Sequence, residues 1–233
     1  MREMLEQQRR FVADASHELR APLTTIQGNL ELLRRFPAMT PQDRLEALSE
    51  TELEAKRLGR LVSDLLSLAR ADAGKKPEQE DVLLEQMLEN AVSQVQEQAR
   101  DYTLELGPLP SSRVQGDRER LLQLVLILLD NALKYTPKGG RICLELIQDS
   151  DDVKLEIRDN GMGISEKDLP HVFERFYRAD QARTRSNDPG GTGLGLSIAQ
   201  WIVGQHGGSI ALESELGVGT TARVTLPLTL PLG

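Results

Sequence analysis

Apolar and small residues in the first third of the chain recur at alternating steps of four and three, the pattern of a helix packed in a bundle. In the first stretch they are Val12, Ser16, Leu19, Leu23, Ile26, Leu30 and Leu33. After RFPAMTPQD, a segment with two prolines, the same spacing continues at Leu48, Thr51, Ala55, Leu58, Val62, Leu65 and Ala69. Two long helices with a short connection predict an antiparallel hairpin. One hairpin cannot bury both apolar faces, so we expect two copies to form a homodimeric four-helix bundle.

The remainder of the chain changes period after ADAGKKPEQED, a segment of glycine, proline and charged residues. Helical patterns cover 83–100, 118–135, 166–178 and 193–207. Alternating patterns predict strands at RICLELIQD, DVKLEIRD, GSIALESE and GTTARVTLPL. Strands segregated from helices predict a two-layer α+β sandwich. We therefore divide the chain into an all-α hairpin (1–73), a linker (74–80) and an α+β domain (81–233).

Composition and charge narrow the class of protein. Of the 233 residues, 39% are hydrophobic and 27% charged, as in an ordinary folded chain, and the net charge of −8 argues against nucleic acid as the main partner. Cys143 is the only cysteine; its strand pattern predicts a small buried residue, and a reducing compartment is the simple interpretation.

The start of the chain, MREMLEQQRRF, lies inside a charged helical stretch, which predicts a fragment of a longer protein. No apolar run approaches the ~20 residues that cross a membrane. We expect this part to lie in the cytoplasm, whether or not the parent protein is anchored in a membrane.

Two glycine-rich motifs predict a nucleotide site. DNGMGIS (159–165) follows a strand, so the Asp159 carboxylate stands at the strand end, where it can accept a hydrogen bond from the exocyclic amine of adenine. Gly161 and Gly163 keep the adjacent surface free of side chains. GGTGLGLSIAQ (190–200) opens a helix, whose free N–H groups and dipole favour phosphate. Either motif alone is also typical of simple turns.

A third motif, LLDNALKYTP (128–137), places Asn131, Lys134 and Tyr135 on one face of a helix. An amide oxygen can bind magnesium, an ammonium group can meet phosphate, and a phenol can flank a base. Taken alone, Asn131 is equally well interpreted as a residue that caps or hydrates the helix.

Five segments together carry a family resemblance. FVADASHELRAPL, LLDNALKYTP, DNGMGIS, VFERFYRAD and GGTGLGLSIAQWIV resemble, in order and spacing, the H, N, first glycine, phenylalanine and second glycine boxes of two-component sensor histidine kinases. The resemblance implies a dimerisation and phosphotransfer hairpin followed by an ATP-binding domain of the Bergerat fold. It implies ATP and Mg²⁺ as cofactors and a response regulator, whose aspartate receives the phosphoryl group, as partner.

The resemblance also assigns roles to individual residues. His17 would be phosphorylated, Asn131 would bind magnesium, Asp159 would recognise adenine, and Thr220 would help hold adenine through water. The nucleotide site would further be lined by Lys134, Tyr135, Gly161, Gly163, Ile164, Gly191, Gly193, Leu194 and Gly195. Residues 177–191 would form a lid over ATP. Apart from the resemblance, Arg183 or Arg185 in this segment could reach phosphate.

Helical geometry bears on the chemistry at His17. With Ser16 on the packed face, His17 and Ala21 fall on the outer face, and Glu18 lies beside them. An uncharged imidazole is nucleophilic near neutral pH, and Glu18 is placed to accept the proton of the ring nitrogen that does not attack. Pro22 cannot donate to the carbonyl of Glu18, so we expect a bend just below the histidine. Without the downstream motifs, His17 would equally fit a surface histidine of a coiled coil.

The sequence departs from the family at two positions. Ile127 stands where the family usually has a second asparagine, which predicts weaker nucleotide binding or slower autophosphorylation. Ala21 stands where many members have Thr or Asn, which predicts weak phosphatase activity. A non-catalytic, ATP-binding signalling scaffold is therefore the alternative to a kinase, whereas an ATPase clamp on DNA conflicts with the H box and the acidic charge.

The remaining histidines and aromatic residues receive structural interpretations. We expect His171 on a helix surface and His206 near a helix C-terminus, where a cation suits the dipole. Phe173, Phe176 and Trp201 are predicted to be core residues.

Overall fold

The computed structural model describes residues 2–36, 38–72, 79–179 and 191–229. The chain forms two compact units: Met1–Ala73 with Gly190–Leu194, and Gly74–Pro189 with Gly195–Gly233. Most of the predicted linker, 74–80, lies outside the described residues, and its last residue, Glu80, already begins a strand.

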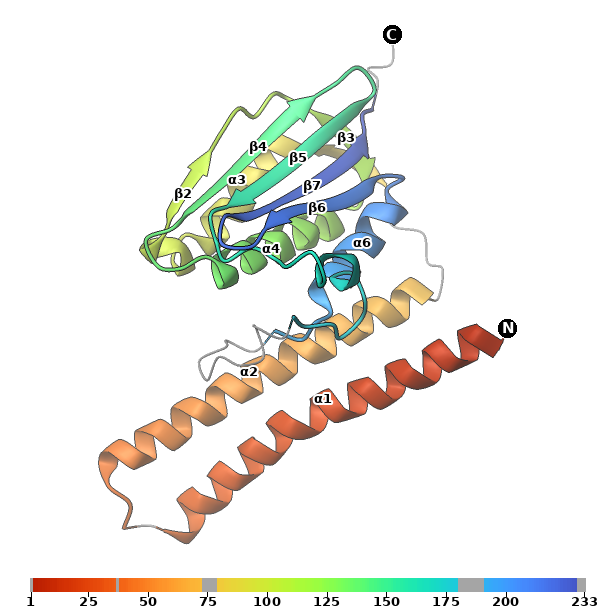
Figure 1. The fold of residues 1–233 in the computed structure, drawn as a ribbon. Coiled ribbons are helices and arrows are strands. Elements are labelled where there is room, and N and C mark those ends of the chain that lie inside the picture. The colour runs from red at the N-terminus through yellow and green to blue at the C-terminus, as the bar shows by residue number, and fades with distance from the viewer. Residues whose placement is uncertain (1, 37, 73–78, 180–190, 230–233) are drawn as a thin grey trace. The chain divides into compact units, whose positions relative to one another are not determined.

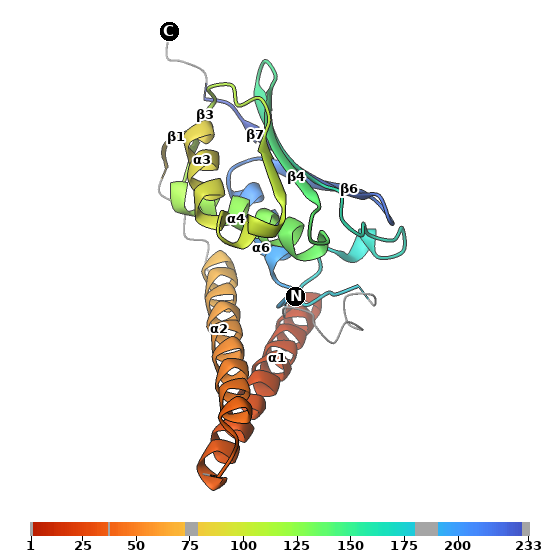
Figure 2. The ribbon, with the colours of Figure 1, turned by 90° about the vertical axis from the view of Figure 1, so that its left-hand side faces the viewer.

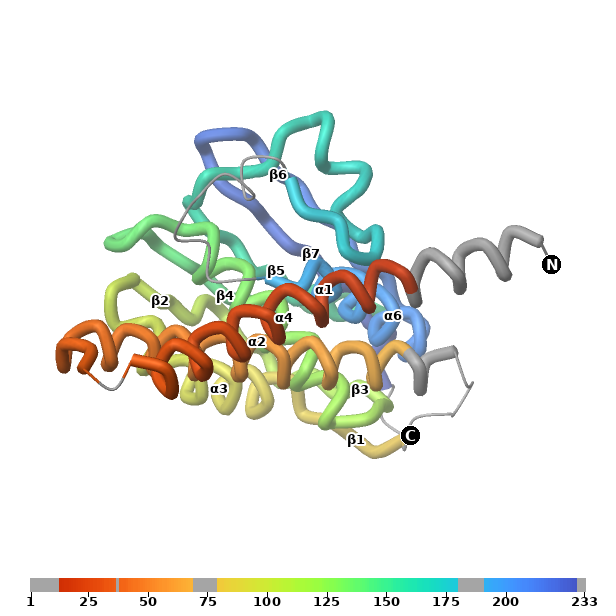
Figure 3. Tube along the Cα trace, turned by 90° about the horizontal axis from the view of Figure 1, so that it is seen from below, coloured from red at the N-terminus to blue at the C-terminus, as the bar shows by residue number. Residues whose placement is uncertain are grey.

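The first unit contains the predicted hairpin. Helices α1 (Arg2–Arg35) and α2 (Pro41–Asp72) run antiparallel (Figure 3). The Thr40 hydroxyl accepts a hydrogen bond from the Asp43 N–H (3.1 Å) and donates to the Asp43 carboxylate (2.7 Å). With Pro41 as the first helical residue, this cap starts α2 directly after the loop.

The packed face of the hairpin differs from the predicted one at several positions, where the residue just before a predicted seam residue is buried in its place. Among the described side chains of the two helices, Ala15, Pro22, Ala47, Leu61 and Leu68 are the buried apolar ones. Six predicted seam residues are instead exposed in the single chain: the small Ser16 and Ala55, and the larger Leu23 (46%), Leu30 (51%), Leu48 (47%) and Val62 (43%). The sequence therefore carries two neighbouring apolar stripes per helix, and the intrachain contact uses only one of them.

The second unit is built on a five-stranded sheet in the order β2-β4-β5-β7-β6 (Figure 1). The four predicted strands are confirmed as β4 (Arg141–Gln148), β5 (Asp152–Asp159), β6 (Ser209–Glu215) and β7 (Gly219–Pro227). Three four-residue strands were not predicted: β1 (Glu80–Leu83), β2 (Thr103–Leu106) and β3 (Arg113–Gly116). Each is too short for its alternation to stand out from a loop.

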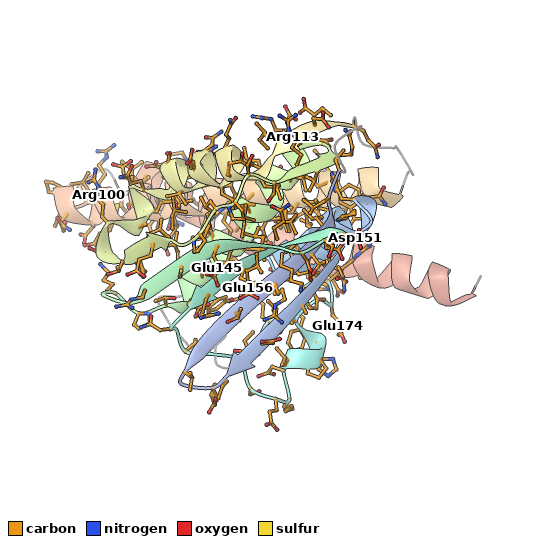
Figure 4. The ribbon with its side chains drawn as sticks, turned by 90° about the horizontal axis from the view of Figure 1, so that it is seen from above. Arg100, Arg113, Glu145, Asp151, Glu156 and Glu174 are labelled. Atoms are coloured by element: carbon orange, nitrogen blue, oxygen red, sulfur yellow. The ribbon has the colours of Figure 1, made fainter. Side chains whose placement is uncertain are left out.

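Helices α3 (Leu84–Val95), α4 (Arg118–Tyr135) and α6 (Gly195–Gln205) cover one face of this sheet (Figure 2). Alternate strand residues, among them Leu144, Leu155 and Val224, are buried on that face. The opposite face carries charged side chains, including Glu145 and Glu156, which lie opposite each other on β4 and β5 (Figure 4). The predicted two-layer α+β sandwich is thereby confirmed.

One predicted helix is shorter than expected, and another is absent. The range 83–100 contains the helix α3 only as far as Val95, followed by a 3-10 turn at Gln98–Asp101. The range 166–178 holds only a 3-10 turn at Leu169–His171 and further single turns. Phe176 adopts φ 64°, a left-handed conformation that no α-helix can contain, and the Tyr177 hydroxyl donates to the Asp168 carboxylate at 2.7 Å. Single-turn backbone hydrogen bonds and side-chain contacts hold this segment in place of a continuous helical ladder.

His206 lies at the C-terminal end of α6, as predicted, and its ring is buried. Its Nε2 accepts the Asp117 N–H at 3.0 Å, and its Nδ1 lies 2.7 Å from the Ile202 carbonyl. Both ring nitrogens are thus engaged with backbone groups, and the side chain joins the end of α6 to the start of α4. His171 is exposed, as predicted, but on a 3-10 turn.

Phe173, Phe176 and Trp201, which were predicted to be core residues, are only half-buried. Cys143 is also half-buried, and burial raises the pKa of its thiol. No helix in the described part of the chain has the length and apolar content that a membrane crossing needs.

Candidate functional site

Asp159 is the last residue of β5, next to the first residues of β7. Its Oδ1 accepts hydrogen bonds from the N–H groups of Gly161 (2.8 Å) and Thr220 (3.3 Å). Burial raises the pKa of this carboxyl group, and the two backbone hydrogen bonds oppose the rise. Both bonds use the same oxygen, and among the described residues Oδ2 has no hydrogen-bond partner. Such a half-buried, oriented carboxylate is suited to accept a hydrogen bond from an amine.

Glycine is required in the loop after β5 because backbone atoms approach it closely. A Cβ at Gly161 would lie 2.5 Å from the Tyr135 carbonyl oxygen and 2.7 Å from Asp159 Oδ1. A Cβ at Gly163, where φ is 68°, would lie 2.0 Å from the Glu215 carbonyl oxygen. Both distances are far below any real contact. The glycines thus allow the loop to pack between the end of α4 and the β6–β7 turn.

Hydrogen bonds from the β6–β7 hairpin fix the same loop. The Gly217 N–H donates to the Met162 carbonyl (2.7 Å), and the Ile164 N–H donates to the Ser214 hydroxyl (2.8 Å). Ser214 Oγ also lies 2.9 Å from the Thr220 hydroxyl. Ser214 is therefore a supporting residue that the sequence alone did not single out, because its place opposite Thr220 follows from the register of β6 and β7.

The N-box residues lie near the C-terminal end of α4. This helix is capped by Asp117, whose carboxylate accepts the Arg120 N–H at 3.1 Å, and it ends at Thr136. Asn131 therefore lies inside the helix and caps neither end. Asn131, Lys134 and Tyr135 are all half-buried, and the Lys134 ammonium lies 5.0 Å from the centre of the Tyr135 ring.

Asn131 has a side chain that fits a magnesium ligand. Within the described ranges its amide makes no hydrogen bond, so its oxygen is available. The same ranges hold no group of three His, Cys, Asp or Glu side chains that could bind a metal by themselves. Magnesium usually takes one or two protein oxygens and completes its shell with phosphate and water, which one amide satisfies.

Ile127 lies one turn before Asn131 and touches the start of α6. Its Cγ2 would be 3.2 Å from a Cβ built on Gly195. A hydrocarbon side chain thus lies beside the first residue of α6, the helix whose N-terminus the sequence predicted as a phosphate site.

Gly191, Gly193 and Leu194 belong to the first unit, whereas Gly195 and Asp159 belong to the second. Gly193 has φ 69° and Leu194 is fully buried. Arg183, Arg185 and most of the predicted lid lie outside the described residues.

On α1, His17 is exposed and Glu18 is half-buried. Glu18 Oε2 lies 3.6 Å from Nη2 of Arg57, a residue of α2 that the sequence did not single out. Pro22 lies inside α1 and is buried against α2, while Ala21 is exposed. The helix is continuous through Pro22, and the bend stays a prediction.

Comparisons with known proteins match both units. A family model described as "His Kinase A (phospho-acceptor) domain" matches residues 7–74, and one described as "Histidine kinase-, DNA gyrase B-, and HSP90-like ATPase" matches residues 116–230. The signal transduction histidine-protein kinase ArlS of Staphylococcus epidermidis is 40% identical over 97% of this chain. This chain spans 50% of the length of ArlS.

Two solved structures have similar folds. The mycobacterial sensor histidine kinase MprB is 32% identical, with a TM-score of 0.57, and the match covers 64% of this chain and 97% of MprB. The histidine kinase ThkA, in complex with the response regulator protein TrrA, matches 98% of this chain and 64% of its own, with a TM-score of 0.77 and 22% identity. The second likeness concerns the fold alone.

Proposed function

Because this chain belongs to the histidine kinase family, we propose that it is the catalytic core of a two-component sensor kinase. In this proposal it transfers the γ-phosphoryl group of Mg-ATP to His17 and then to an aspartate of a response regulator. The observation that carries it is the oriented Asp159 carboxylate in an ATPase-type fold, encoded in one chain with an exposed histidine next to Glu18. We retain 1–73 as the phosphotransfer domain and 81–233 as the ATP-binding domain, joined by the linker 74–80.

Adenine recognition is assigned to Asp159. Its Oδ1 is held by two backbone N–H groups, and Oδ2 would accept a hydrogen bond from the adenine amine. Guanine has no amine at that position, so it would lose this bond. Thr220, whose hydroxyl is oriented by Ser214, would hold the base through water, and Gly161, Gly163 and Ile164 would line its edge.

The phosphate end of the site is assigned to α4 and the start of α6. Asn131 would bind Mg²⁺, which neutralises charge on the phosphates when bound. Lys134 would meet phosphate and Tyr135 would flank the nucleotide. Gly191, Gly193, Leu194 and Gly195 would complete the phosphate cradle with backbone N–H groups.

Phosphoryl transfer would occur in line. One His17 ring nitrogen forms a bond to the γ-phosphorus while the bond from that phosphorus to the bridging oxygen of ADP breaks. The proton on the other ring nitrogen passes to the Glu18 carboxylate, which prevents a positive charge from remaining on the ring.

Dimerisation is assigned to the second apolar stripe of the hairpin. Leu23 and Leu30 on α1, with Leu48 and Val62 on α2, are exposed in the single chain and lie on one edge of it by helical spacing. A second copy would bury them. We expect Val62→Glu to yield monomers in light scattering, whereas Leu53→Glu, an exposed leucine on the opposite face of α2, remains dimeric. A dimeric Val62→Glu protein would contradict this assignment.

The partner of the phosphorylated dimer would be a response regulator receiver domain. The solved ThkA complex contains such a regulator protein, and this chain shares its fold. No nucleic-acid partner is proposed, in line with the net charge of −8.

Labelling with γ-³²P-ATP and magnesium tests the proposal. We expect acid-labile, base-stable label that is absent from His17→Gln. The alternative, a non-catalytic scaffold, is favoured only by Ile127 in the N box; intact ATP binding without any label would support it and exclude the kinase.

A further inference from the structure

An arginine on α2 lies between two carboxylates at the level of the phosphoacceptor. Arg57 Nη2 is 3.6 Å from Glu18 Oε2, and Arg57 Nη1 is 3.8 Å from Glu54 Oε2. All three side chains are partly withdrawn from water, with exposed fractions of 23% for Arg57, 37% for Glu18 and 19% for Glu54. The cluster links α1 to α2 directly beside His17.

The arrangement has one cation for two anions. Both distances exceed the 2.7–3.2 Å of a direct N–H···O hydrogen bond, so the guanidinium is within ion-pair range of both carboxylates without being committed to either. Glu54 Oε2 is buried and accepts no hydrogen bond from the described residues. Glu54 therefore depends on Arg57 and competes with Glu18 for it.

The cluster lies on the edge of the hairpin away from the exposed apolar stripe. In helical projection, Glu18 and Leu30 fall on opposite sides of the packed α1 face that contains Ala15 and Pro22. Arg57 and Val62 are likewise separated by the packed face of α2. A second copy seated on the apolar stripe would thus leave the cluster uncovered and next to His17.

We propose that Arg57 is a positioning residue for phosphorylation of His17: it holds the Glu18 carboxylate at the hairpin seam, and Glu54 limits how tightly it does so. This inference rests on the proposed kinase function, in which Glu18 receives the imidazole proton. Once Glu18 is protonated, a single carboxylate remains for Arg57, and the guanidinium is matched one to one with Glu54. The competition therefore lowers the cost of proton transfer to Glu18 while keeping its side chain in place.

The test is the pH dependence of the initial rate of His17 labelling in the full chain. Its acid-side midpoint reports loss of the neutral imidazole, and nearby charges move it. By helical spacing, the charged groups on this edge within about two turns of Glu18 or Arg57 include Asp14, His17, Glu50, Glu54, Arg60 and Asp64, besides Arg57 itself. Removing a cation from this group favours protonation of the His17 imidazole, and removing an anion opposes its protonation.

We expect opposite shifts from the two partners of Glu18. Arg57→Gln lowers the maximal rate about tenfold and moves the midpoint to higher pH by about half a unit, because its positive charge no longer opposes protonation. Glu54→Gln moves the midpoint to lower pH, because Arg57 then serves Glu18 alone. Arg57→Lys keeps the charge and retains the midpoint, while KM for ATP is unchanged in all three.

Matched controls are available on the same helix. Lys56 and Glu52 form an exposed pair, each with 67% of its side chain accessible, so Lys56→Gln and Glu52→Gln change the same charges away from the cluster and leave the profile unmoved. Midpoint shifts of the same sign in Arg57→Gln and Glu54→Gln, or none, would overturn the inference. If Arg57→Gln does not fold, Glu54→Gln decides alone: an unmoved midpoint refutes the competition. A wild-type chain without label would instead refute the kinase function.

Discussion

Replacing Ile127 with asparagine should strengthen ATP binding. Ile127 is half-buried on α4, one turn before Asn131, and its methyl group touches the start of α6 at Gly195. An asparagine there would place an amide where the hydrocarbon now covers the helix N-terminus, on the same face as the proposed magnesium ligand. It adds a polar partner for phosphate or for a water bound to magnesium.

The size of the effect follows from two opposing contributions. One added hydrogen bond to a charged group is worth about 1.5–3 kcal/mol, which corresponds to roughly 10-fold to 100-fold in Kd. Without nucleotide, the variant loses half-buried hydrocarbon, which costs about 1 kcal/mol of unfolding free energy. We therefore expect Ile127→Asn to bind Mg-ATP at least tenfold more tightly while unfolding at slightly lower urea concentration.

Isothermal titration with a non-hydrolysable ATP analogue and magnesium measures the affinity, and urea unfolding measures the stability. Leu126→Asn is the matched control, since Leu126 is the adjacent half-buried residue and points about 100° away around the helix. It should lose stability without any gain in affinity. A folded Ile127→Asn protein with unchanged Kd would refute the idea that this position faces the nucleotide.

Three further predictions concern the β5 loop and the phosphoacceptor helix. Gly163→Ala should destabilise the chain by about 2–3 kcal/mol in urea unfolding, because φ is 68° and the new Cβ would collide with the Glu215 carbonyl oxygen. Gly204→Ala, whose Cβ would lie in open space on α6, should not destabilise it. Equal unfolding midpoints of the two variants would contradict this prediction. Asp159→Asn should lower ATP affinity at least tenfold yet raise stability without nucleotide at pH 7. Burial raises the pKa of the Asp159 carboxyl, so its favourable contribution to the free energy of unfolding is complete below about pH 4 and is lost as the pH rises through the pKa of the folded state. Because asparagine never ionises, the variant avoids that loss. Tighter ATP binding or lower stability of Asp159→Asn would contradict the prediction. Ala21→Thr should increase Glu18-dependent dephosphorylation of a phosphorylated regulator, measured by phosphate release, and rapid release by the unaltered chain would show that this hydroxyl is not needed.

Long, regular patterns in the sequence predicted their elements well. The two hairpin helices and four of the strands follow directly from periodicity, because each repeats its pattern over seven or more residues. The three four-residue strands were missed, and the segment after Ser165 was mistaken for a helix, because hydrogen bonds such as that of Tyr177 with Asp168 join residues that no local pattern connects.

By itself, the sequence determined the helical hairpin, the α+β sandwich, and the chemical types of the groups offered to a nucleotide and a phosphoryl group. Those properties depend on local periodicity and on the residue types in the five family motifs, which occur in a fixed order along the chain. Only the tertiary structure decided which apolar stripe packs within one chain, because two such stripes lie side by side on each helix. It alone brought Ser214 to the β5 loop, Ile127 to the start of α6, and Arg57 between Glu18 and Glu54. Apart from Arg57 and Glu54, which are three positions apart on α2, these contacts join residues at least 39 positions apart, whose proximity depends on how the elements pack and not on any pattern within one element.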